Sequence, residues 1–166
     1  MNRWIKYLLI VLEVGGGFMG FSMLIVSLMN TGIPASSWIF PILILTGAMF
    51  LFGIVAGLAL LERPQLGAAM SAVYQALQIP VVSSPLLTYT LLSGLRLGVG
   101  WFKGRPAFLF EFGARCTFFL FRRSDPWIIG VNVLALVLFV YLLSQIQPKA
   151  KATEPSSKST NSSGIN

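Results

Sequence analysis

Glu13 is the residue whose type and position most clearly suggest chemistry. It lies about nine residues into an apolar stretch that opens at Trp4, which is roughly 13 Å along a helix. An ionisable group at that depth in a bilayer costs a few kcal/mol and is a functional candidate by default. Gln75 and Gln78 are expected at a similar depth, where either could hydrogen-bond to the carboxyl group. A paired structural acid is favoured over a proton relay, because a relay needs further ionisable steps within the membrane.

Other catalytic chemistry has little support in the sequence. The chain has no histidine and a single cysteine, Cys116, so it lacks the commonest general base and metal ligand and cannot form an intrachain disulfide. We find no P-loop, dinucleotide fingerprint, nucleophile elbow or zinc-ligand spacing. The sequence therefore predicts a protein that is not an enzyme and that holds no cofactor or metal.

The composition points to a lipid environment. Of the 166 residues, 55% are hydrophobic and 10% are charged, whereas about 25% of the residues of a soluble domain are charged. The net charge is +7, but the basic residues adjoin apolar stretches, as is typical of residues that orient a chain in a membrane. A nucleic-acid surface would need them clustered on one face. The lipid bilayer is therefore the predicted partner, and nucleic acid is not.

Four apolar segments are long enough to be considered as transmembrane helices, since a bilayer core needs about 20 residues. We predict a multi-pass integral protein of the cell membrane, mainly α-helical, with four transmembrane helices in one membrane domain, residues 1–146. The polar residues 147–166 form a tail that is predicted to be disordered. The expected helices cover about residues 4–29, 38–61, 65–84 and 127–146.

The third of these helices is marginal, which leaves a three-span alternative open. Gln75, Gln78 and Pro80 make residues 65–84 only moderately apolar, and a helix on the cytoplasmic face would fit as well. The tight link at Glu62–Pro64 favours the spanning interpretation, because short links join antiparallel neighbours.

The positive-inside rule orients the chain. Arg3 and Lys6 predict a cytoplasmic N-terminus. With four spans the insert before the last helix would lie outside and the tail inside, and with three spans the two sides would be exchanged.

Two G-x-x-x-G motifs suggest close helix packing. Gly16 and Gly20 lie in the first apolar segment, and Gly53 and Gly57 lie in the second. Small residues at this spacing let two helix backbones approach closely. Packing of these two helices against each other is favoured over dimerisation.

Residues 86–122 change from helical to alternating periodicity, which is typical of half-buried strands. Residues 103–106, Lys-Gly-Arg-Pro, have turn chemistry. We therefore predict a small antiparallel β-hairpin insert before the last helix, which a strand from Leu86 to Leu92 could extend. A short amphipathic helix or a re-entrant loop is the alternative.

The hairpin register follows if Phe102 pairs with Ala107 across a four-residue loop. The facing apolar pairs are then Trp101 with Phe108, Val99 with Phe110 and Leu97 with Phe112. Arg96 lies opposite Gly113 on the polar face. A slip of one residue would scramble both faces, so the agreement supports the pairing.

The predicted function is that of a non-enzymatic accessory or interaction protein of the membrane. It presents the apolar strand face to lipid, to another membrane protein or to a second copy of itself. The candidate partner face consists of Leu97, Val99, Trp101, Phe108, Phe110 and Phe112. The alternative is a small oligomeric ion or solute transporter or channel component that uses Glu13.

Overall fold

The chain begins with one long helix that a π-helical turn divides. The computed structural model describes residues 2–31, 39–102, 104–120 and 127–146. α1 covers Arg3–Ile10, the π-helical turn η1 covers Val11–Gly15 and α2 covers Gly16–Thr31. Asn2 caps this helix, because its side-chain oxygen accepts a hydrogen bond from the backbone N–H of Trp4. The predicted tail and most of the predicted link between the first two helices lie outside the described residues.

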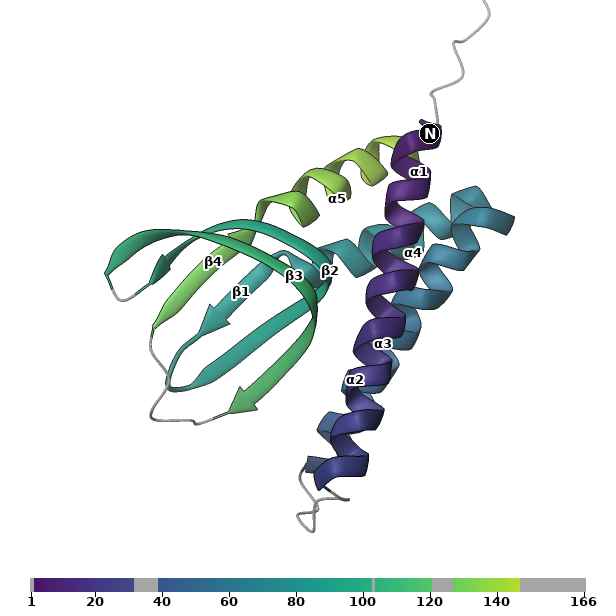
Figure 1. Cartoon of the computed structure of the whole chain (residues 1–166). Helices are drawn as coiled ribbons and strands as arrows, with labels where there is room; N and C mark the ends of the chain where they lie inside the picture. Colours follow the sequence, from purple (N-terminus) through teal and green to yellow (C-terminus); the bar gives the residue numbers. More distant parts are fainter. Residues whose placement is uncertain (1, 32–38, 103, 121–126, 147–166) are drawn as a thin grey trace, which may run out of the picture.

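Two further helices follow, and they pack as a compact layer with the first. α3 covers Ile39–Glu62 and α4 covers Pro64–Gln78. α3 runs antiparallel to the first helix, side by side with it (Figure 1). Pro64 occupies the first turn of α4, where its missing N–H costs nothing.

The remaining elements form a curled antiparallel sheet and a last helix (Figure 1). The bounds are β1 Pro80–Ser83, β2 Leu87–Phe102, β3 Arg105–Leu120, β4 Ile128–Asn132 and α5 Val133–Ile146. β2 and β3 pair along their whole length. β1 pairs with the first half of β2 and with β4, and β4 pairs in turn with the second half of β2. These three strands therefore close into a ring.

Two glycines let the long hairpin bend so that this ring can close. Gly94 in β2 and Gly113 in β3 lie opposite each other, with φ angles of +91° and +144°. Glycine adopts such angles at little cost, whereas other residues do not. The bend brings β2 against the middle of the first helix, beside Leu12.

The prediction of a mainly helical protein with four transmembrane helices is wrong. Within the described ranges only Arg3–Asn30 and Ile39–Glu62 are long and apolar enough to cross a membrane. The predicted hairpin belongs to a larger four-stranded sheet. The three-span alternative fails on the same finding.

The third expected span ends early for a local reason. α4 stops at Gln78, because Pro80 has no backbone N–H with which to continue the helical hydrogen bonds. Ile79 is the last residue to donate one, to the carbonyl oxygen of Ala76. From Pro80 the chain continues as β1. α4 is therefore a 15-residue helix of about 22 Å, shorter than a bilayer core of about 30 Å.

The last expected span is divided between a strand and a helix. Ile128–Asn132 form β4, which suits its β-branched residues. α5 keeps only 14 residues, or about 21 Å, so it too is shorter than the bilayer core.

The hairpin register differs from the predicted one by two residues. Phe102 pairs with Arg105, so the loop has two residues rather than four. Gly104 has a φ of +83°, which suits a two-residue hairpin turn. The facing pairs are Trp101 with Pro106, Val99 with Phe108, Leu97 with Phe110 and Leu95 with Phe112. A shift of two leaves every side chain on its predicted face.

On the polar face the same shift gives Arg96 a different partner. Arg96 lies opposite Glu111, not opposite Gly113 as predicted. The strand considered from Leu86 to Leu92 is the first part of β2, which begins at Leu87.

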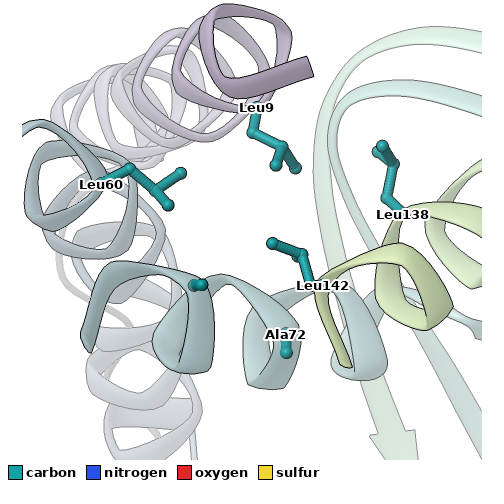
Figure 2. Packing of buried hydrophobic residues seen from close by; sticks show 6 residues of the cluster. Leu9, Leu60, Ala72, Leu138 and Leu142 are labelled. Atoms are coloured by element: carbon teal, nitrogen blue, oxygen red, sulfur yellow. The ribbon is translucent and has the colours of Figure 1, made fainter. Parts of the chain in front are cut away.

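A small apolar core joins the helices where α1, α3, α4 and α5 meet (Figure 2). Its buried members are Leu9, Leu60, Ala68, Ala72, Leu138 and Leu142. The side chains come from both ends of the sequence, so α5 is held against the N-terminal half of the chain. The backbone N–H of Asn2 donates to the Tyr141 hydroxyl at 2.9 Å, which places the C-terminal end of α5 beside the start of α1.

Candidate functional site

Glu13 is fully buried and has two hydrogen-bond donors from α4. The Ser71 hydroxyl donates to Glu13 Oε2 at 2.7 Å, and Gln75 Nε2 donates to Glu13 Oε1 at 3.0 Å. Ser71 and Gln75 are four residues apart, so one face of the helix presents both. Glu13 itself lies in the π-helical turn. The carboxyl group thus ties the first helix to α4.

The structure separates the predicted polar trio. It brings Gln75 to Glu13, but Gln78 has another partner, because its Oε1 accepts from the backbone N–H of Ser93 at 3.3 Å. Ser71 was not among the predicted residues. Its spacing of four from Gln75 is the signal that could have identified it.

The four predicted packing glycines divide between three partners. A Cβ at Gly20 would overlap the ring of Phe50, and one at Gly57 would crowd Val14, so these two glycines do serve the contact between the long helices. Gly16 instead lies against Ser93 and Gly94 of β2. Gly53 makes room for the ring of Tyr74 from α4. These glycines therefore allow close packing of α4 and of the sheet, as well as of the two long helices against each other.

Replacing Glu13 tests what this polar contact contributes. Glu13→Leu leaves the Ser71 hydroxyl and the Gln75 amide buried without an acceptor, and we expect a loss of about 1–3 kcal/mol of unfolding free energy. Glu13→Gln should lose much less, because the amide can still accept from one donor and the hydroxyl can rotate to accept from it. Guanidinium unfolding of the detergent-solubilised protein measures both.

Glu62→Leu is the control for that comparison. Glu62 is exposed at the end of α3, so its loss should change stability by no more than about 0.5 kcal/mol. Equal stabilities of Glu13→Leu and the wild type would contradict a structural role for the buried carboxyl group.

The outer face of the curled sheet is apolar, and the helices cover only part of it. Near the bend, Leu91 packs with Phe50 and Tyr74, and Ala114 and Cys116 lie against the same cluster. Toward the hairpin tip no described element covers this face. We call the uncovered part the outer Phe patch, which consists of Leu97, Val99, Trp101, Phe108, Phe110, Phe112, Ile129 and Val131.

All six residues of the predicted partner face belong to the outer Phe patch. Phe108, Phe110 and Phe112 are 92%, 73% and 76% exposed. Ile129 and Val131 of β4 extend the patch, because they pair with Trp101 and Val99. These two residues were missed, since they were assigned to a transmembrane helix.

The inner face of the curl carries most of the polar side chains of the sheet and lines an open cavity of about 200 Å³. All four strands line it, and the residues are Val81, Ser83, Thr88, Thr90, Arg96, Leu109, Glu111, Arg115, Thr117 and Ile128. The Arg96 Nη1 donates to Glu111 Oε2 at 3.0 Å across the strand pair. The sheet is therefore apolar outside and polar inside, which is the reverse of the usual arrangement in water.

Arg96 is the most buried charge of this inner face. Burial lowers the pKa of the guanidinium from its usual value, the Glu111 carboxylate raises it, and the positive charge of Arg115 lowers it. An arginine nevertheless keeps its charge in a protein. Arg115 is thus near enough for the two positive charges to repel each other.

No protein-family model matches the chain, and no curated protein or solved structure is significantly similar to it.

Proposed function

We propose that the chain is a non-enzymatic accessory protein of the membrane, which is anchored by two long helices and presents the outer Phe patch to lipid acyl chains. One observation carries the proposal: the curled sheet is apolar outside and polar inside. A sheet with this polarity suits a surrounding of hydrocarbon, as in the barrels that span membranes.

The position of the sheet along the first helix supports contact with lipid. Leu12 lies at the bend of β2, and Met19 lies beside Gly113 of β3. These two residues are about 13 Å and 24 Å along the helix from Arg3. A bilayer core is about 30 Å thick, so a spanning first helix would hold this part of the sheet at hydrocarbon depth.

The pairing of three of the four strands fits the same surroundings. Backbone N–H and C=O groups in hydrocarbon must be paired within the protein. In the ring of β1, β4 and β2, each strand pairs with the other two. β3 pairs with β2 on one side and contacts α2, but none of the described strands pairs with its other edge.

The basic residues provide an orientation. Arg3 and Lys6 lie at the start of the first helix, and Arg63 follows the end of α3, at the same end of the antiparallel pair. Under the positive-inside rule this end is cytoplasmic. The protein then crosses the membrane twice. α4 begins at the cytoplasmic side, directly after α3, and α5 ends at the same side, beside the start of α1.

Spin labels can test where the outer Phe patch lies. In a Cys116→Ser background, which removes the only natural cysteine, a nitroxide is attached at Phe110→Cys in protein reconstituted in phospholipid vesicles. We expect several-fold more frequent collisions with oxygen, which partitions into hydrocarbon, than with a water-soluble nickel chelate.

Arg105→Cys is the matched control, because Arg105 is exposed at the hairpin tip and carries a charge that belongs in water or among headgroups. The label there should collide relatively more with the nickel chelate. More frequent nickel collisions at position 110 than at position 105 would refute the proposal. Low access of both reagents to position 110 would also refute it, because it would indicate that protein covers the patch.

The alternative prediction, transport of an ion or solute through Glu13, gains no support from the contacts of this residue in the described part of the chain. Both carboxylate oxygens accept hydrogen bonds, and the residue has no exposed surface. An ion path would need this carboxyl group to reach water.

A further inference from the structure

The cavity inside the curled sheet is not explained by the two anchoring helices or by contact of the outer Phe patch with acyl chains. It is lined by side chains of all four strands, and its hydroxyl groups include those of Thr90 and Thr117. A sheet of this size could fill its interior with apolar side chains at less cost, since burying polar groups and charges is unfavourable unless they are paired. The polar lining therefore needs an explanation of its own.

Arg96 is only 3% exposed, yet it is incompletely paired. Its Nη1 bonds to Glu111, and its Nη2 lies 3.5 Å from the Leu91 carbonyl oxygen, which is a long contact. Its Nε is buried and has no hydrogen-bond partner in the described structure. Buried donors in proteins almost always have a partner, so an unpaired one needs an explanation, and a bound ion or ligand is one.

The charges that line the cavity do not balance. Arg96 and Arg115 contribute two positive charges, and Glu111 contributes one negative charge. The excess is one positive charge, next to donors on two guanidinium groups and on threonine hydroxyls. Guanidinium groups bind phosphate and carboxylate in a fixed geometry.

We propose that this cavity binds an oxyanion, a phosphate group, between Arg96 and Arg115, with Thr90 and Thr117 as further donors. The phosphate belongs either to an anionic phospholipid headgroup or to a free phosphate ion. Arg115 is exposed, so an anion can reach the cavity along β3. The site does not depend on lipid contact at the outer face, because it lies on the opposite face of the sheet.

Calorimetric titration of the full chain in detergent micelles tests the site with two probes, inorganic phosphate and dihexanoyl phosphatidylglycerol. We expect at least one of them to bind. Arg115→Gln should weaken that binding on the order of tenfold, since it removes a charge-assisted contact. Binding of phosphate alone identifies a free ion as the ligand, and tighter binding of the phospholipid identifies a headgroup.

Arg105→Gln is the matched control, because it removes the same charge from the hairpin tip, outside the cavity lining. It should leave binding unchanged. The double variant Arg96→Gln/Glu111→Gln should also abolish binding. If this variant fails to fold, the binding measured for Arg115→Gln still tests the proposal, because position 115 is exposed. Absence of binding of both probes overturns the proposal, as does equal weakening by Arg105→Gln and Arg115→Gln.

Discussion

Replacing Gly16 with alanine is expected to destabilise the protein by about 3 kcal/mol, at the upper end of the usual cost of overpacking. A Cβ at this position would overlap Ser93 and the backbone of Gly94, where β2 bends toward the helix. Backbone atoms cannot move aside by a change of rotamer. The methyl group would therefore force the first helix and the sheet apart.

Gly15→Ala is the control for this prediction. Gly15 is the preceding residue of the same helix, and a Cβ there meets nothing within 4 Å. Alanine also favours the helical conformation by up to about 1 kcal/mol relative to glycine. Gly15→Ala should therefore leave the protein as stable as the wild type or more so, as measured by guanidinium unfolding in detergent. Similar unfolding midpoints for the two variants would mean that the helix and sheet are not in close contact.

Phe110→Arg is the second substitution with a large expected effect, and the size of that effect depends on what surrounds the outer Phe patch. If acyl chains surround the patch, an arginine there should lower the unfolding free energy in phospholipid vesicles by up to about 2–4 kcal/mol, which is the cost at the bilayer midplane. If water surrounds it, the same change at an exposed position should alter stability by no more than about 0.5 kcal/mol. Guanidinium unfolding of the protein reconstituted in vesicles measures the change in unfolding free energy and so distinguishes the two cases.

Phe110→Leu controls for the loss of the aromatic ring. It keeps an apolar side chain at the same position, so it should remain within about 1 kcal/mol of the wild type if the side chain contacts lipid rather than a packed core. A stability of Phe110→Arg equal to that of Phe110→Leu would contradict the lipid-facing position of the patch.

The two faces of the hairpin could be predicted from the sequence because side chains alternate strictly along a strand. Phe108, Phe110 and Phe112 share a face, and a shift of the strand pairing by two residues does not change which face that is. The register itself was two residues wrong, because the loop was taken as four residues. Gly104 was the available signal, since a glycine at a two-residue turn is typical of tight hairpins.

The number of spans could not be obtained from hydropathy. Ile128–Asn132 are as apolar as a transmembrane segment, but they form β4, because they pair with β1 and β2. Those partners are tens of residues away in the sequence, and no local pattern reports them. α4 presents the same difficulty, since a short buried helix and a spanning helix have similar composition.

The polar contacts were predictable in part. The depth of Glu13 indicated that a partner was needed, and Gln75 was correctly placed within reach. The inner cavity was not foreseen, because the predicted register set Arg96 against Gly113 rather than Glu111. Curvature of the sheet, which turns one strand face into a cavity lining, depends on the bend at two glycines and not on alternation.

The ring of β1, β4 and β2 also has a consequence for biogenesis. The two long helices are complete once the ribosome has passed Glu62, and each is long and apolar enough to cross a membrane without the other. β1 emerges soon afterwards, but its partner β4 ends at Asn132, so the ring cannot close until nearly the whole described chain has been synthesised. During that interval the edges of β1 and β2 need protection from other chains. If the two long helices anchor the protein as proposed, its assembly proceeds in two stages, with the anchor inserted during translation and the sheet closed at its end.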